Sequence, residues 1–127
     1  MMGQTSDIEK SVKCTAAIAT AYTIAKFGAD DDTLSAATAS TEELIGVFQH
    51  TTSVAGEEVR IMLSGISLIK LGGTVTRGGW ITTDASGQGV AAAPGAGVNA
   101  AVIGRAFASG VLGDLIPVFL SPGRIQG

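Results

Sequence analysis

The sequence predicts an all-β protein with at most one or two short helices, folded as a compact β-sandwich or β-barrel. Short runs of residues that favour strands are separated by closely spaced glycine-rich turns. The apolar content is carried by small aliphatic side chains, because 46% of the 127 residues are hydrophobic but only 5% are aromatic, and 18 are glycine. A chain of this length suits one domain with its own core. We therefore expect a flexible N-terminal arm over residues 1–14 and a single mainly-β domain over residues 15–127.

The expected arm is polar and has neither a strand period nor a helix period. Its larger apolar residues are Ile8 and Val12, which offer little surface to offset the entropy of ordering the segment. An extended arm of this length could reach another molecule. An ordinary frayed terminus is the alternative.

Two segments are harder to assign. Residues 16–25 fit both a helical stripe and a strand, although Tyr22, Thr23 and Ile24 favour a pleated surface. Residues 38–44 could form one short helix, with Ser40 or Thr41 as its cap and acidic residues in its first turn. The first assignment stays open between strand and helix.

Alternation becomes clear from residue 57. Val59, Ile61 and Leu63 fall on one face, and the intervening residues fall on the other, as in a half-buried antiparallel strand that ends at Gly65. Further strands are expected over residues 67–71, 74–76, 80–83, 98–107 and 115–120.

The sequence also contains an internal echo. An Ile-Gly strand, a glycine-plus-acid turn and an alternating strand occur around Gly46 and Gly56, and again around Gly104 and Gly113. The two strand–turn–strand units lie about 57 residues apart. Any two β-hairpins share such a pattern, so the echo supports the all-β prediction more than it proves a duplication.

Composition excludes several functions. The net charge is −3 and the eight basic residues are scattered, which argues against nucleic-acid binding. The single cysteine cannot form an internal disulfide, and one histidine cannot support a Cys/His zinc site. The N-terminus lacks the features of a signal peptide, and the uncharged window over residues 85–104 is too rich in glycine and alanine to span a membrane.

No convincing catalytic or cofactor motif is found. Residues 95–100 match G-x-G-x-x-A, but no buried strand precedes them and no helical pattern follows. Asp30, Asp31 and Asp32 are expected to form a solvated turn, because the alternating ligands of a calcium loop are missing. His50 is expected in a loop, and Trp80 in the core or at a subunit interface. We expect no enzymatic activity, no cofactor and no metal.

Several segments resemble the head decoration, or capsid cement, proteins of tailed bacteriophages. The resemblance covers about residues 22–122 and rests on turn and strand patterns, namely Leu44-Ile45-Gly46-Val47, Ala55-Gly56-Glu57-Glu58-Val59-Arg60-Ile61, Leu63-Ser64-Gly65, Gly72-Gly73-Thr74-Val75-Thr76-Arg77-Gly78-Gly79-Trp80-Ile81-Thr82-Thr83-Asp84, Gly87, Ile103-Gly104-Arg105-Ala106 and Ile116-Pro117-Val118-Phe119-Leu120.

The resemblance implies a non-enzymatic homotrimer that binds the outer surface of an expanded icosahedral head, at three-fold or quasi-three-fold sites, and stabilises it. In similar proteins the N-terminal arm pairs with a strand of the major capsid protein. Carried onto this chain, the capsid-binding residues of the arm would be Thr5, Ile8, Val12, Lys13 and Cys14. The implied location is the virion, after assembly in the host cytoplasm.

Two alternatives come from other classes of protein. A component of a phage tail or fibre would share the β-strand pattern, although elongated repeats are not seen. A β-barrel that binds a small molecule is favoured only by the glycine-rich stretch, since no convergent set of polar residues accompanies it.

Overall fold

The computed structural model describes residues 5–127, and it confirms the all-β prediction. The nine strands are β1 (Thr5–Cys14), β2 (Ile24–Phe27), β3 (Thr33–Ala36), β4 (Leu44–Phe48), β5 (Glu58–Lys70), β6 (Trp80–Thr83), β7 (Gly89–Ala91), β8 (Asn99–Ala106) and β9 (Leu115–Gln126). They form one continuous sheet in the order β1-β3-β2-β4-β5-β9-β8-β6-β7, with an additional pairing of β1 with β5.

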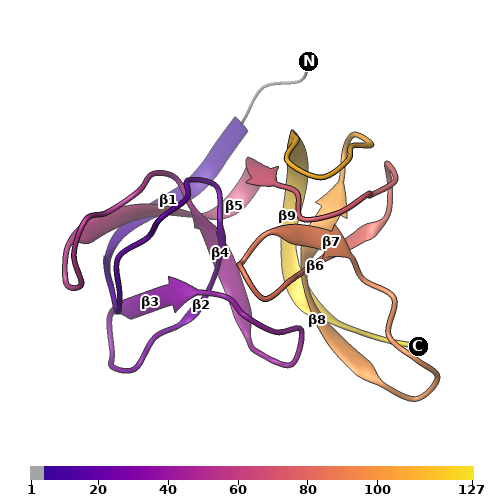
Figure 1. Cartoon of the computed structure of the whole chain (residues 1–127), viewed down its shortest axis with the longest axis horizontal. Coiled ribbons are helices and arrows are strands. Elements are labelled where there is room, and N and C mark those ends of the chain that lie inside the picture. Colours follow the sequence, from indigo (N-terminus) through magenta and orange to yellow (C-terminus); the bar gives the residue numbers. More distant parts are fainter. Residues whose placement is uncertain (1–4) are drawn as a thin grey trace.

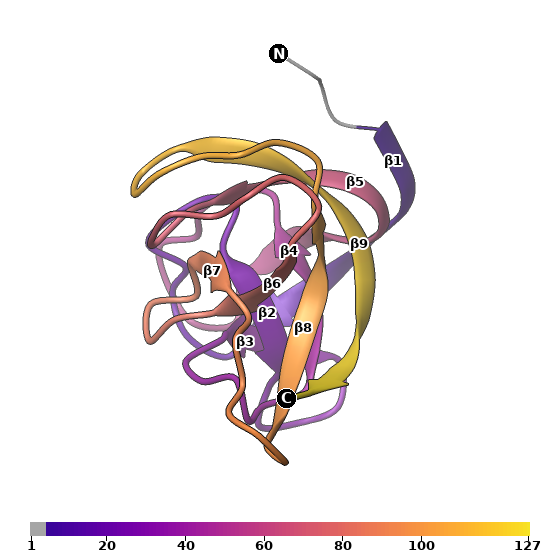
Figure 2. The same ribbon diagram turned by 90° about the vertical axis from the view of Figure 1, so that its right-hand side faces the viewer.

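The sheet folds into two small barrels that share β5. Pairing of β1 with both β3 and β5 closes the first barrel, formed by β1 to β5. The second barrel contains β6 to β9 and the last part of β5, and a parallel bridge between Leu71 and Gly89 joins its two ends. Figure 1 shows the first barrel on the left and the second on the right, and Figure 2 looks onto β8 and β9 of the second barrel.

The internal echo marks a structural repeat. Gly56 donates its N–H to Cys14 O (2.9 Å), and Gly113 donates its N–H to Leu71 O (2.9 Å), about 57 residues later. Both glycines have positive φ, 86° and 88°, which side chains rarely adopt. The acidic residue after each glycine caps the amide three residues before it, as Asp114 does for Val111 at 2.9 Å. The echo therefore extends from two hairpins to the two barrels.

Each barrel has its own hydrophobic core. The core of the first barrel consists of Val12, Cys14, Ile18, Ala25, Leu34, Phe48, Val59 and Ile61. The larger second core combines the interior of the second barrel, including Ile69, Ile103 and Val118, with side chains from the first barrel, namely Ile24, Ala37, Leu44, Val47 and Met62. The strands β2, β4 and β5 of the first barrel are thus covered on both faces.

The helix expected over residues 38–44 is wrong. The chain turns at residues 39–42, and β4 begins at Leu44. Glu42 does accept from the amides of Thr38 (2.7 Å) and Ala39 (2.9 Å), as a residue in a capping box would. No helix follows because Lys26 is paired with Leu44, which draws the next residues into the sheet beside β2.

The structure settles the open assignment of residues 16–25 and corrects two expected strands. The ambiguous segment becomes a strand only from Ile24, and Tyr22 before it has a positive φ of 61°. The strand from residue 57 does not end at Gly65, because a φ of 109° there lets β5 continue to Lys70 and pair with β9. The run at residues 74–76 forms only an isolated bridge between Val75 and Gly110.

The N-terminal segment also differs from the expected mobile arm. Residues 1–4 lie outside the described residues, but Thr5–Cys14 forms β1, which pairs antiparallel with β5 and, at Lys13 and Cys14, parallel with β3. Burial of Val12 and Cys14 and the long ladder of backbone pairs with β5 offset the entropy that is lost when this segment becomes ordered. The composition did not predict this.

Candidate functional site

The structure separates the five predicted capsid-binding residues into buried and exposed groups. Val12 and Cys14 point into the first core, with 9% and 1% of their surface exposed. The Cys14 thiol lies 3.3 Å from Thr52 Oγ1. Ile8 is 53% exposed and Lys13 is exposed, while the backbone of Thr5 is paired with Ile66. While β1 stays in the barrel, Val12 and Cys14 cannot contact a partner.

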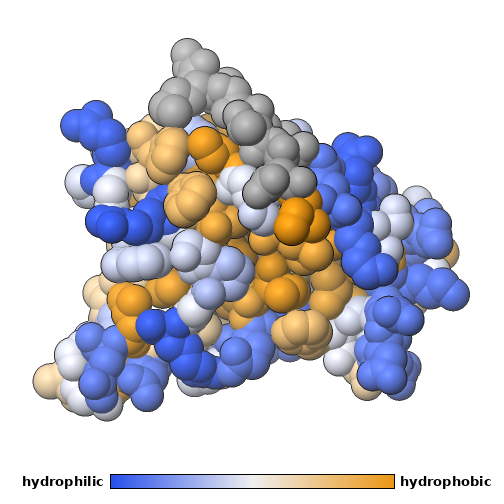
Figure 3. Space-filling view, turned by 180° about the vertical axis from the view of Figure 1, so that it is seen from behind, coloured by the Kyte–Doolittle hydropathy of each residue, from blue (hydrophilic) through white to orange (hydrophobic). Residues whose placement is uncertain are grey.

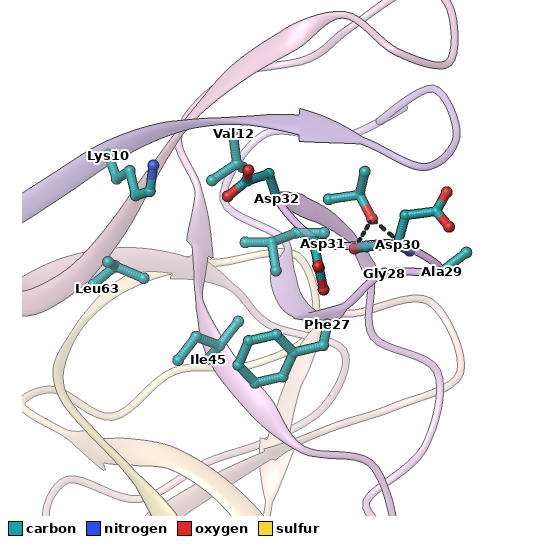
Figure 4. A pocket seen from close by; sticks show the side chains of 12 residues that line it. Lys10, Val12, Phe27, Gly28, Ala29, Asp30, Asp31, Asp32, Ile45 and Leu63 are labelled. Carbon is teal, nitrogen blue, oxygen red and sulfur yellow. Dashed lines mark hydrogen bonds between the residues drawn. The ribbon is translucent and has the colours of Figure 1, made fainter.

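A pocket of about 780 Å³ opens at the mouth of the first barrel, near the middle of β1. Its apolar lining comes from all five strands of the first barrel, since Leu34 of β3 joins Val12, Phe27, Ile45 and Leu63, which Figure 4 labels. Phe27 is 59% exposed, which is unusual for a large aromatic side chain beside a core. The pocket therefore offers apolar surface that nothing in the described chain covers.

The rim of this pocket is acidic. Asp30, Asp31 and Asp32 line one side of it, and Lys10 lies on β1 opposite them. All three aspartates are exposed, and none forms an ion pair within the described residues. The turn is fixed by hydrogen bonds of Thr33, whose hydroxyl donates to Asp30 O (2.6 Å), and Asp32 has a φ of 62°. The predicted solvated turn thus forms the negative edge of an apolar pocket.

A row of large side chains crosses the outside of the second barrel on three neighbouring strands. Trp80 of β6 is paired with Arg105 of β8, and Arg105 is paired with Phe119 of β9. We call Trp80, Arg105 and Phe119 the outer row. The guanidinium carbon of Arg105 lies 5.2 Å from the Trp80 ring centroid, and the Phe107 ring stacks on Phe119 with centroids 6.1 Å apart.

The outer row is held rigidly but remains accessible. Arg105 donates from Nε (3.0 Å) and Nη2 (2.8 Å) to Gly78 O, which fixes its side chain across the indole of Trp80. Phe119 is 46% exposed, and Leu115, Val111 and Leu112 nearby in the sequence are also exposed. Figure 3 shows that hydrophobic side chains gather across the middle of one face of the molecule, with hydrophilic residues on both sides. Exposed apolar areas of this kind mark sites of protein association.

One acidic side chain has a strongly shifted pKa. Burial raises the pKa of Glu42, but hydrogen bonds from Lys26 (Nζ to Oε2, 2.5 Å), Thr38 and Ala39 outweigh it and lower the pKa from 4.5 to about 2. These contacts join β2 to the turn before β4. Their effect is structural, since Glu42 lies outside both exposed surfaces.

The motifs considered for chemistry have structural roles. His50 accepts from the Arg60 amide through Nε2 (3.0 Å), while its Nδ1 faces Thr51 O (3.0 Å), so the ring joins the ends of β4 and β5. Residues 95–98 form a turn before β8, in which Val98 donates to Gly95 O (2.9 Å). Within residues 5–127, no group of three His, Cys, Asp or Glu side chains could hold a metal ion, and no helix could span a membrane.

Sequence reasoning missed both surfaces. The run of three aspartates is evident in the sequence, but alternation alone does not predict that Phe27, Ile45 and Leu63 converge on it from three strands. Trp80 was expected in the core or at an interface, and it lies half-buried in the outer row. Phe119 lies in a segment whose sequence is typical of an ordinary strand. Only the register of β9 with β8 shows that it is a neighbour of Arg105.

The fold defines an all-β protein built from two barrels, with an apolar pocket and an aromatic row exposed on its surface. Among solved structures it is similar to the N base of the head fiber gp8.5 in bacteriophage phi29. The two share a TM-score of 0.61 and 18% sequence identity, and the similarity covers 94% of this chain and 98% of that chain. At this identity the likeness establishes the fold alone. No protein-family model matches the sequence, and no curated protein matches it.

Proposed function

We propose that this chain is a structural, non-enzymatic protein of a phage head. The observation that supports it is the similarity of fold over nearly the whole length of both chains to the base of a phage head fiber. The decoration-protein resemblance of residues 22–122 points independently to the same location, the outer surface of the head. Neither argument depends on a catalytic residue, a cofactor or a nucleic-acid contact.

The proposed role is that of a capsid decoration protein, which binds the major capsid protein and stabilises the expanded head as a homotrimer. Repeated weak contacts to a symmetric shell need avidity, and a trimer raises a modest affinity by about 10² to 10⁴. Head attachment is assigned to the first half of β1. This part pairs with β5 but not with β3, and it presents Ile8, so a capsid strand can add to it.

A second candidate is the anchoring base of a head fibre. The neighbour in phage phi29 favours it, because that structure is described as a base of a fiber rather than as a cement protein. Both candidates predict binding to heads. They differ in effect, since a decoration protein raises the temperature at which heads disrupt and a fibre base does not.

Co-sedimentation with expanded phage heads tests head attachment. Saturable binding is expected for the intact chain, and Ile8→Asp is expected to weaken it at least tenfold. Val98→Asp is the matched control, because Val98 is 54% exposed and lies in the turn before β8, outside β1. Deleting residues 1–14 is not a suitable test, since it removes β1 from the barrel. Failure of the intact chain to bind any expanded head would refute the proposal.

A further inference from the structure

The outer row has a buried counterpart in the first barrel. Ile24 of β2 is paired with Val47 of β4, and Val47 is paired with Met62 of β5. These three residues occupy the same places in the first barrel as Trp80, Arg105 and Phe119 in the second, about 57 residues later. We call Ile24, Val47 and Met62 the inner row. The repeat therefore supplies two equivalent rows, of which the inner row is buried and the outer row is exposed.

The inner row is buried because it covers the second barrel. Ile24, Val47 and Met62 are at most 1% exposed and belong to the same core as the interior of the second barrel. The loop over residues 84–88 meets β2 there, since Ile24 donates its N–H to Gly87 O (2.8 Å). The mouth of the second barrel is thus closed by the outer face of the first.

The mouth of the first barrel has no such cover. Its loop over residues 28–32 is the counterpart of residues 84–88, since Gly28 donates to Thr33 O (2.9 Å) as Asp84 donates to Gln88 O (2.9 Å). That loop rims the open pocket beside Phe27. Each molecule therefore exposes one uncovered mouth, on the first barrel, and one uncovered row, on the second barrel. The equivalent row of the first barrel and mouth of the second barrel already contact each other within the molecule.

The charges of the two exposed surfaces are complementary. The inner row is entirely apolar, whereas the outer row carries Arg105 at its centre. The loop in the covered mouth has Asp84, whose carboxylate accepts from the amides of Ser86 (2.8 Å) and Gln88 (2.9 Å), while the open mouth has three aspartates without ion pairs in the described chain. Lys10 is the only basic side chain in the pocket lining. The rim therefore retains net negative charge to meet an arginine.

We propose that the outer row of one molecule docks into the pocket of a second copy of the same chain. Phe119 covers the apolar lining around Phe27, Ile45 and Leu63, and Arg105 faces Asp30, Asp31 and Asp32. The inference rests on the self-association in the proposed function and names its surfaces. Because the two surfaces differ, the contact is heterologous, and repeated contacts close into a ring, such as a trimer, or continue as a filament.

Sedimentation velocity of the free protein tests the contact without phage heads. The wild-type chain is expected to associate with increasing concentration, and more weakly at high salt because of the arginine–aspartate contact. Phe119→Glu disables the row, and Phe27→Glu disables the pocket. Each is expected to weaken association at least tenfold. Val54→Glu is the matched control, because Val54 is as exposed as Phe27 (59%) and lies on neither surface.

Mixing the two disabled variants provides the decisive readout. Phe119→Glu retains an intact pocket and Phe27→Glu retains an intact row, so the mixture is expected to form a 1:1 dimer that cannot grow further. In an isologous dimer each row would enter the pocket of the other molecule, so the mixture would regain only one of two contacts and the wild-type chain would stop at dimers. Thermal unfolding of both variants checks that each is folded, and Arg105→Gln provides a milder disruption of the row if Phe119→Glu unfolds.

Three results would overturn the inference. These are a wild-type chain that stays monomeric up to millimolar concentration, variants that associate as the wild type does, and a mixture of the variants that stays monomeric. Head binding is measured separately, by co-sedimentation. Loss of self-association with retained head binding would refute the contact alone, whereas association without head binding would refute only the proposed function.

Discussion

Ile61 and Met62 are neighbours in β5, yet their side chains are buried in two different hydrophobic cores. Ile61 points into the first barrel, and Met62 points out of it and into the second core. The same division separates Val47 from Phe48 in β4. Because the central strands contribute to both cores, neither barrel can lose its packing without exposing apolar surface of the other.

Truncating either residue is expected to destabilise the whole molecule. Ile61→Ala and Met62→Ala each remove a fully buried side chain, which costs about 2–5 kcal/mol. Both variants should lower the midpoint of one common transition in chemical denaturation, followed by circular dichroism and by Trp80 fluorescence. Leu112→Ala, at a position 70% exposed, should change stability by less than about 0.5 kcal/mol. Two separate transitions would show that the barrels unfold independently.

The repeated Ile-Gly strands predict a specific intolerance to side chains. A Cβ at Gly104 would collide with the backbone carbonyl of Phe119, and one at Gly46 would lie 2.5 Å from Met62 O. Gly104→Ala and Gly46→Ala are expected to lower thermal stability by at least about 2 kcal/mol, because backbone must shift in a paired ladder. Gly123→Ala is the control, since no heavy atom lies within 4 Å of the added group. Equal stability of all three would contradict the close approach of these strands.

The shifted pKa of Glu42 predicts a loss of stability in acid. Its folded-state pKa of about 2 lies below the ordinary value of 4.5, so its stabilisation is complete above about pH 4.5 and disappears as the pH falls towards 2. Glu42→Gln should cost about 1–2 kcal/mol at pH 7, allowing for solvent screening, and should flatten the pH dependence below 4.5. Thermal melts between pH 2 and 7 measure both effects. Glu43→Gln is the neighbouring control, because Glu43 is largely exposed.

Burial of Cys14 predicts a slow thiol reaction that reports on β1. With 1% exposure, the thiol should react with Ellman's reagent only when β1 leaves the barrel. A thiol at the exposed neighbouring position, in a Lys13→Cys variant that also carries Cys14→Ser, should react at least a hundredfold faster. Equal rates would mean that Thr5–Cys14 is a free arm in solution, as its composition suggests.

Local patterns predicted several strands. Runs of strand-favouring residues between glycine turns identified β6, β8 and the first half of β9, and alternation identified the first half of β5. The same reasoning assigned Met62 to a polar face because Arg60 and Ser64 flank it, although a second barrel covers that position. The pocket and the outer row were not predicted, since both depend on which strands are neighbours, and register is a long-range property.

The placement of β5 also determines how the protein carries mechanical load. β1 and β9 are both antiparallel to β5, so they run in the same direction on the shared strand. A pull on the start of β1 and the end of β9 therefore acts in opposite directions along β5, which loads many backbone hydrogen bonds together rather than unzipping them one at a time. A force applied between the start of β1 and the end of β9 is therefore resisted in the shear direction by the ladders on both edges of β5.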